Sequence, residues 1–243
     1  MRRLPVRPNL PRKTQVRLNK ETAKIIASPS PIETAAKRYA AARKAKWFEP
    51  VLKTLGAMTG PGEPCMLCDA NESTDVEHYR PKAVFPHLAL VWGNLLWGCT
   101  NCNRHKGNQF PPDTKPGARL IDPIEENVWD YFLIDRFGNL IPKWRQDTNA
   151  LDERAVSTRD LLYLNRETLQ ARRHSRLNDL RQLTSMTLNQ LHAGTIQVGE
   201  ARERLKEWRS SPTQPDVADY FLGGPGSSEQ PFCNLLAILI GAA

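Results

Sequence analysis

The C-terminal third of the chain has apolar residues at helical spacing. Between about residues 165 and 192 they recur every three or four positions, so they share one face of a predicted helix that Asn165 can cap. The residues of this face are Leu177, Leu180, Leu183, Met186, Leu188 and Leu191. A second apolar stripe begins near Gly199 and predicts another helix.

The chain begins with a basic, proline-rich stretch. Residues 1–30 hold eight lysines and arginines against one acid, and repeated prolines interrupt any regular element, so we expect an extended basic arm. Such an arm either stays solvated or contacts nucleic acid or a partner. Next, a capping Ser30 and a Pro31 at the first helical position predict the start of a basic helix. We expect Pro50 to end this helix.

Two short strands and an apolar tail complete the pattern. Tyr131–Asp135 and Leu140–Trp144 flank a turn sequence and predict a β-hairpin. The tail Cys233–Ile240 predicts either a final helix packed on the chain's own core or a segment that docks on a partner, with Cys233 as a small buried residue. We therefore divide the chain into a basic extended arm (1–30), an N-terminal helical segment (31–60), a Cys- and His-rich core (61–120), a β-hairpin and connector (121–150), and a helical C-terminal region with an apolar tail (151–243).

Composition narrows the classes of protein to which the chain can belong. The formal charge of +8 favours an anionic partner but does not distinguish nucleic acid from other anions. The longest apolar run is shorter than the roughly 20 residues that a membrane span needs, and no apolar segment like that of a signal peptide follows the basic N-terminus. We therefore expect a cytoplasmic protein with no membrane partner. The sequence has no G-x-x-x-x-G-K-[ST] motif, so any dependence on ATP must come from another chain.

Four of the five cysteines form two C-x-x-C pairs, Cys65 with Cys68 and Cys99 with Cys102. Each pair lets two thiolates point at one metal ion from a tight turn, and two such turns complete a tetrahedral site that favours zinc. The odd number of cysteines suits a reducing compartment better than a disulfide framework. We therefore predict a structural Zn²⁺ held by all four thiolates, against the alternative of two unrelated cysteine pairs.

Residues suited to phosphodiester hydrolysis lie between and after these pairs. The reaction needs a base to activate water and a cation to stabilise charge on the phosphate and the leaving oxygen. Glu77 and His78 can supply one hard oxygen ligand and one base, and Asn103 offers a second oxygen ligand suited to Mg²⁺. The nearby cations that we expect to contact phosphate are Arg80, Lys82, Arg104 and Lys106.

Three groups of residues together resemble the ββα-metal motif of HNH endonucleases. They are Glu77-His78 with a following proline, Asn94, and the segment from Cys102-Asn103 to Lys106. The resemblance covers residues 65–108. It implies that His78 is the general base and that Glu77 and Asn103 hold one Mg²⁺ or Mn²⁺. It also implies that Asn94 holds the loop and keeps His78 aimed. Glu77 stands where Asp is commoner, so the metal geometry can differ.

The fold that follows is mainly α, with a small ββα-metal (HNH) core stabilised by the Cys₄ zinc site and a short β-hairpin. We expect a metal-dependent nuclease, with DNA as the favoured substrate. One alternative is a ribonuclease, for example one that cleaves tRNA with the same site. Another is a zinc-bound nucleic-acid or protein adaptor without catalysis. His105 is either a phosphate contact or an ordinary surface histidine.

A wider set of motifs lies in residues 30–190. They are Glu77–Lys82, Trp92–Cys99, Asn103–Asn108, Leu120–Pro123, Gly138–Pro142 and Leu161–Asn165. This set resembles the PtuB nucleases of Septu anti-phage defence systems, some of which are linked to retrons. The resemblance implies a PtuA-type ATPase as the partner that controls the nuclease. For a retron-linked member it also implies a reverse transcriptase with its DNA–RNA product.

Overall fold

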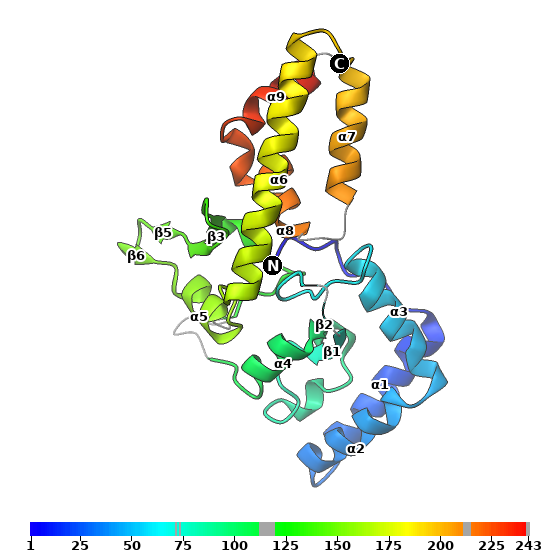
Figure 1. Cartoon of the computed structure of the whole chain (residues 1–243). Coiled ribbons are helices and arrows are strands. Elements are labelled where there is room, and N and C mark those ends of the chain that lie inside the picture. The colour runs from blue at the N-terminus through cyan, green and yellow to red at the C-terminus, as the bar shows by residue number, and fades with distance from the viewer. Residues whose placement is uncertain (71, 73, 112–119, 211–214, 242–243) are drawn as a thin grey trace.

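The computed structural model of the chain is mostly helical, with short antiparallel strands between residues 74 and 151 (Figure 1). It describes residues 1–70, 72, 74–111, 120–210 and 215–241. The α-helices are α1 (Arg12–Ile26), α2 (Pro31–Arg43), α3 (Glu49–Met58), α4 (Thr100–Lys106), α5 (Glu153–Leu161), α6 (Glu167–His192), α7 (Val198–Ser210), α8 (Pro215–Gly223) and α9 (Phe232–Gly241). The strands are β1 (Thr74–His78), β2 (Leu95–Cys99), β3 (Phe132–Ile134), β4 (Leu140–Pro142), β5 (Trp144–Arg145) and β6 (Ala150–Leu151). The mainly helical fold expected from the sequence is confirmed.

Helix α1 contradicts the expectation that residues 1–30 form an extended arm. Pro11 lies just before the first residue of the helix and no proline lies within it, so the prolines interrupt the chain only outside α1. Leu18 and Ile25, seven positions apart, are buried on one face, and α1 packs against α2. Glu21 is also buried, and its Oε2 lies 2.5 Å from Nη1 of Arg38 on α2. A basic composition is therefore compatible with a packed helix here.

The basic helix expected between Ser30 and Pro50 is divided into two helices. A short 3₁₀ turn at Lys46–Phe48 separates α2 from α3. Pro31 begins α2, but the side chain of Ser30 makes no capping hydrogen bond. Pro50 lies in the first turn of α3, where its missing N–H breaks no intrahelical hydrogen bond. A proline expected to end one helix therefore belongs to the start of the next.

Strands β1 and β2 form an antiparallel hairpin in which Thr74 pairs with Cys99 and His78 with Leu95. Helix α4 follows β2 directly, so its first residues lie at one end of this hairpin (Figure 1). The described part of the expected core therefore runs strand, strand, helix. Residues 112–119 of that core lie outside the described residues.

Two further hairpins follow the core. Strands β3 and β4 pair antiparallel, with Leu133 opposite Ile141, and they confirm the predicted hairpin. Strands β5 and β6 pair Trp144 with Leu151 and were not expected. Each of these strands has only two residues, which is too short for alternation of apolar and polar positions to appear in the sequence.

Helix α6 is the long element against which α7, α8 and α9 pack (Figure 1). Leu177, Leu180 and Leu188 are buried, as their spacing predicts, whereas Met186 is 53% exposed. Met186 lies about 200° around the helix from Leu188, so it points away from the buried face. The apolar face of α6 is therefore narrower than the sequence suggested.

Helix α9 is the apolar tail, and it packs on α6 and α7 within the chain. Phe232 and Leu235 are buried, but Cys233 is partly exposed, contrary to expectation. Asn165 does not cap α6. Its side-chain amide instead accepts a hydrogen bond from the Leu140 N–H (2.8 Å) and donates one to the Leu140 carbonyl (3.0 Å), which ties the start of α6 to β4. Within the described part of the chain, no helix is long and apolar enough to cross a membrane.

The turn between β3 and β4 makes a testable contact with α6. Gly138 has φ +83°, and an added Cβ would lie 2.6 Å from the carbonyl oxygen of Gln170. Gly138→Ala should therefore lower the free energy of unfolding by about 2–4 kcal/mol, from left-handed strain and overpacking together. Gly199→Ala on α7 is the matched control, because its Cβ meets no atom within 4 Å, and it should stabilise by about 0.5–1 kcal/mol. Urea denaturation measures both, and equal values for the two variants would contradict the contact.

Candidate functional site

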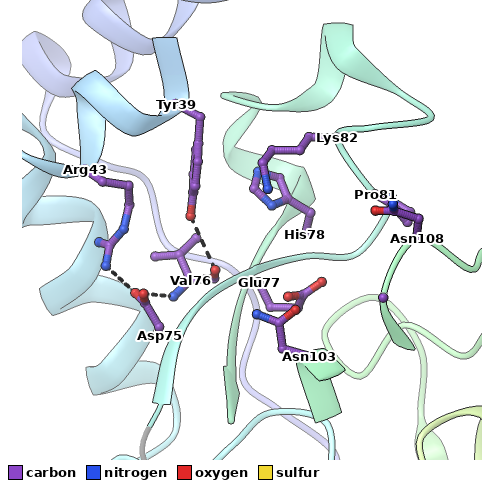
Figure 2. Close-up of a pocket in the computed structure, with 11 residues that line it drawn as sticks. Tyr39, Arg43, Asp75, Val76, Glu77, His78, Pro81, Lys82, Asn103 and Asn108 are labelled. Carbon is purple, nitrogen blue, oxygen red and sulfur yellow. Dashed lines mark hydrogen bonds and ion pairs between the residues drawn. The ribbon is translucent and has the colours of Figure 1, made fainter. Parts of the chain in front are cut away.

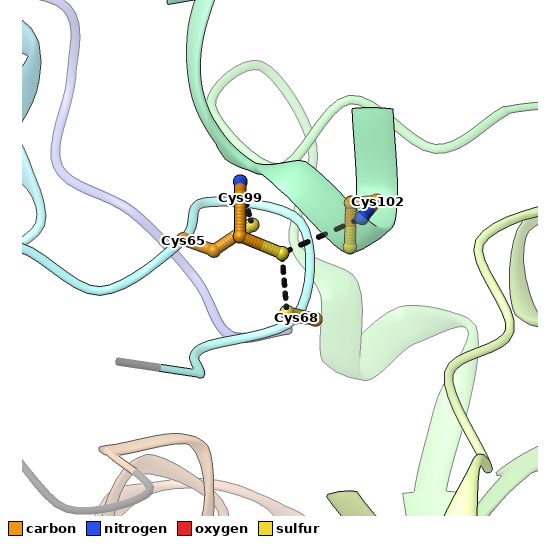
Figure 3. A group of neighbouring side chains, drawn as sticks. All are labelled: Cys65, Cys68, Cys99 and Cys102. Carbon is orange, nitrogen blue, oxygen red and sulfur yellow. Dashed lines mark hydrogen bonds between the residues drawn. The ribbon is translucent and has the colours of Figure 1, made fainter. Parts of the chain in front are cut away.

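The four cysteines of the two C-x-x-C pairs meet in one buried cluster (Figure 3). All four Sγ atoms lie within 4.8 Å of one another, and the Sγ atoms of Cys68 and Cys99 are 3.7 Å apart. A tetrahedral zinc–thiolate site with Zn–S bonds of about 2.3 Å has S···S edges of about 3.8 Å. The cluster therefore fits a metal ion such as zinc, and the prediction that the four cysteines form one group is confirmed.

Backbone N–H groups point at these sulfur atoms. The N–H of Cys99 donates to Cys65 Sγ (3.2 Å), and the N–H of Cys102 donates to Cys99 Sγ (3.4 Å). Cys65 and Cys68 lie in the turn before β1, whereas Cys99 ends β2 and Cys102 lies in α4. Such donors stabilise negative charge on thiolates. The cluster joins the turn, the hairpin and the helix at a single point.

Arg166 brings a positive charge to the cluster from the C-terminal region. It immediately precedes α6, and its Nη2 lies 3.6 Å from Cys68 Sγ and 3.3 Å from Glu72 Oε1. The side chain is only 9% exposed. Four thiolates around a divalent ion carry a net negative charge, which a buried guanidinium partly neutralises. Sequence spacing gave no sign of this contact, because Arg166 is nearly 100 residues from Cys68.

A cleft of about 380 Å³ lies beside the hairpin and holds the predicted catalytic residues (Figure 2). Glu77 and His78 come from β1, and Asn103 comes from α4 immediately after Cys102. The other lining residues are Tyr39, Arg43, Asp75, Val76, Pro81, Lys82, Gly107 and Asn108. The fold therefore brings Glu77, His78 and Asn103 to one cavity.

His78 is held from two sides. Its Nε2 lies 2.9 Å from the carbonyl oxygen of Ala89, and the Tyr39 ring packs edge-on with centroids 4.7 Å apart. A carbonyl only accepts, so Nε2 carries the proton and Nδ1 has the lone pair. Burial lowers the pKa of His78 to about 4, although the Ala89 hydrogen bond opposes this, and nearby Lys82 lowers it further. The imidazole is therefore neutral at pH 7 and able to accept a proton.

Glu77 is buried and paired with Lys106. Lys106 Nζ lies 2.9 Å from Glu77 Oε1, and the lysine side chain is 1% exposed. The expectation that Lys106 contacts phosphate is therefore corrected: its position in α4 turns it inward against β1. A Cβ on Gly98 would lie 2.8 Å from the Glu77 Cβ, so the absence of a side chain at Gly98 makes room for the first carbons of the Glu77 side chain.

Asn94 closes the loop that follows β1. Its Nδ2 donates to the carbonyls of Arg80 (3.0 Å) and Leu88 (3.1 Å), and its Oδ1 accepts from the Arg80 N–H (2.8 Å). Asn94 is 5% exposed. Because Leu88 directly precedes Ala89, these bonds fix the segment whose carbonyl holds His78.

The remaining predicted cations lie in different surroundings. Lys82 lines the cleft with its Nζ 5.0 Å from the Tyr39 ring centroid. Arg80 is partly buried, with its guanidinium carbon 5.0 Å from the Phe110 ring centroid. Arg104 is exposed on α4. These three cations remain candidate phosphate contacts.

The N-terminal helices supply cleft residues that the sequence did not indicate. Tyr39 and Arg43 lie on α2, and Arg43 pairs with Asp75 of β1 (Figure 2). The Tyr39 hydroxyl donates to the carbonyl of Val76 at 3.3 Å. Only the amphipathic spacing of α2 could have indicated an inward Tyr39, and that spacing does not say which segment the helix contacts.

No family model matches the chain. The chain is 28% identical over 124 residues to the Septu protein PtuB of Bacillus thuringiensis, which covers 49% of this chain and 43% of that relative. It is 33% identical over 75 residues to the Septu protein PtuB of Bacillus mycoides (strain KBAB4), which covers 25% of each chain. The matches thus span less than half the length of these curated relatives. The similarity supports the resemblance to Septu PtuB proteins over about half of the chain.

The Arg166 contact predicts how firmly the cluster holds its metal. Arg166→Met removes the charge but keeps a long apolar side chain, so zinc release to a chromogenic chelator should become about ten-fold or more faster. Arg172→Met is the control, because Arg172 is 46% exposed and lies 4.0 Å from the carboxylate of the same Glu72. Equal release rates for Arg166→Met and wild type would show that Arg166 does not stabilise the charged cluster.

Proposed function

We propose that the chain is a metal-dependent nuclease of the HNH type that hydrolyses phosphodiester bonds, with DNA as the favoured substrate. The observation that carries the proposal is the joint placement of Glu77, His78 and Asn103 in one cleft. The neutral imidazole of His78, with its lone pair on Nδ1, supports a role as general base. The strand–strand–helix order and the similarity to PtuB proteins agree with this proposal.

The donor set in the cleft fits a hard divalent cation. Glu77 offers a carboxylate and Asn103 an amide oxygen, and Figure 2 places both side chains at the same side of β1. These are ligands that Mg²⁺ or Mn²⁺ accepts. Lys106 holds Oε1 of Glu77, which orients the carboxylate and leaves Oε2 for a metal. A bound cation would supply positive charge to the scissile phosphate and to the leaving 3′ oxygen.

The chain's own residues account for the movement of the proton. Nδ1 of His78 takes a proton from water, the water oxygen bonds to phosphorus, and the bond to the 3′ oxygen breaks. The 3′ oxygen leaves with the bonding electrons and takes a proton from solvent water to become a hydroxyl. The carbonyl of Ala89 and the ring of Tyr39 keep the imidazole in one orientation while its charge changes. Lys82 and Arg104 balance charge on the phosphates beside the scissile bond without reading bases.

The similarity to PtuB proteins supports a wider proposal about the biological setting. We infer that the nuclease is the effector of a Septu-type anti-phage defence system and acts with a PtuA-type ATPase. A retron reverse transcriptase with its DNA–RNA product is a further candidate partner. The same site is compatible with RNA cleavage, so the test below determines whether the substrate is DNA or RNA.

The nuclease proposal predicts a result for plasmid DNA, single-stranded DNA and tRNA incubated with Mg²⁺, Mn²⁺ or EDTA. Each reaction is run with the chain alone and with a PtuA-type ATPase added. His78→Ala should lower the rate of metal-dependent cleavage by about 10²–10⁴-fold, because the general base is lost. His87→Ala is the matched control: His87 is exposed, outside the cleft residues, and should leave the rate unchanged.

Two results would contradict the proposal. Either none of the polymers is cut even with the ATPase present, or His78→Ala cuts as fast as wild type. In the first case a zinc-bound adaptor becomes the better account; in the second, His78 is not the general base. That account predicts no effect of His78→Ala on nucleic-acid or partner binding, and unfolding of the core when Cys99 is replaced by Ala.

A further inference from the structure

A pair of stacked aromatic rings lies outside the cleft, and one of the two is on the helix that carries Asn103. His105 of α4 stacks on Tyr163, which follows α5, with ring centroids 5.2 Å apart and an interplanar angle of 24°. Both side chains are exposed, and Tyr163 is 57% exposed. The pair therefore presents a flat aromatic face to solvent. Neither ring has a role in the chemistry proposed above.

The backbone at Tyr163 is in an unusual conformation for its residue type. Its φ is +52°, in the left-handed region that glycine favours after the end of a helix. Its N–H donates to the carbonyl of Asp160 (3.2 Å), and its carbonyl accepts from the N–H of Arg166 (3.1 Å). A bulky aromatic residue is an outlier in this region. Since the ring is largely exposed, its burial does not account for its presence, and such strain points to a function.

The position of the pair relative to the cleft is fixed by α4. His105 comes two residues after Asn103, so the two side chains lie on roughly opposite sides of one helix about 10 Å wide. Arg104 lies between them and is exposed. A nucleic-acid strand with one phosphate in the cleft can therefore follow Arg104 around α4 and bring a neighbouring base to the rings.

We propose that Tyr163 and His105 form a stacking platform for an unpaired nucleobase next to the scissile phosphate. The inference rests on the proposed nuclease function and names its substrate as a single strand, a loop or an unpaired base. Aromatic faces stack any base regardless of its sequence, whereas a base inside a duplex has both faces covered by its neighbours. Arg104 would hold the phosphate between the cleft and the platform.

The test measures binding without added Mg²⁺ or Mn²⁺, which prevents metal-dependent cleavage and leaves the ion of the cysteine cluster in place. The probe is a short oligothymidine that carries one 2-aminopurine, whose fluorescence is quenched by stacking; DNA and RNA versions and the matching duplexes are compared. Wild type should quench the single strand more than the duplex. Tyr163→Gly should weaken single-strand binding by about five-fold or more and abolish the extra quenching. Tyr163→Phe keeps the ring and should retain both.

A second readout separates a binding role from a structural one. If Tyr163 were present for stability, Tyr163→Gly would lower the unfolding temperature. The platform predicts the opposite, an unchanged or higher unfolding temperature, because glycine relieves the left-handed strain. Unchanged single-strand binding in Tyr163→Gly, an absence of binding by wild type, or a large fall in unfolding temperature would overturn the platform.

The outcome is distinguishable from the fate of the nuclease proposal. Ring-dependent binding combined with cleavage that survives His78→Ala would support the platform and reject the assigned general base. Cleavage that His78→Ala abolishes, together with binding that Tyr163→Gly leaves unchanged, would support the nuclease and reject the platform. Quenching of the 2-aminopurine that depends on the Tyr163 ring supports the platform whether the strand is DNA or RNA.

Discussion

The Cys65–Cys68–Cys99–Cys102 cluster is the constraint on which the arrangement of the cleft depends. It fixes the turn before β1 to the junction between β2 and α4. Helix α4 has seven residues, which is too short to be stable alone in water. Asn103 follows Cys102 directly, so any movement of the cluster moves Asn103 relative to Glu77. A metal ion such as zinc at the cluster would therefore hold the geometry of the cleft without taking part in it.

The charges around the cleft are arranged in pairs between different elements. Glu77 and Lys106 join β1 to α4 in a buried ion pair, and Arg43 and Asp75 join α2 to β1. Removing one partner of the buried Glu77–Lys106 pair leaves an uncompensated charge, so this contact strongly restricts how β1 and α4 can move relative to each other. The Arg43–Asp75 pair contributes less, because Asp75 is 61% exposed. Arg166 extends the same pattern to the cluster from the C-terminal region. The helical regions on both sides of the hairpin thus contribute to a site whose motif lies between them.

The sequence predicted the parts of the fold that depend on local chemistry. Two C-x-x-C pairs predicted one cluster because thiolates at that spacing share a metal, and leucine spacing predicted most of the buried face of α6. The composition of residues 1–30 led to a wrong prediction of an extended arm, because it is rich in charge and proline. The structure has helix α1 there, with Leu18 and Ile25 buried on one face. Lys106 was placed among exposed cations because charge does not show which side of a seven-residue helix turns inward. Tyr39 and Tyr163 each contact a segment that is distant in the sequence. No short-range sequence pattern indicates such contacts.

A manganese titration followed by electron paramagnetic resonance tests the central claim, that Glu77 and Asn103 form a metal site beside a base that is not a ligand. The account predicts one Mn²⁺ bound per wild-type chain. It predicts affinity about ten-fold or more weaker in Asn103→Ala, which loses an oxygen ligand, and unchanged affinity in His78→Ala. An Asn103→Ala variant that binds Mn²⁺ as tightly as wild type, or a wild-type chain that binds none, would contradict the account.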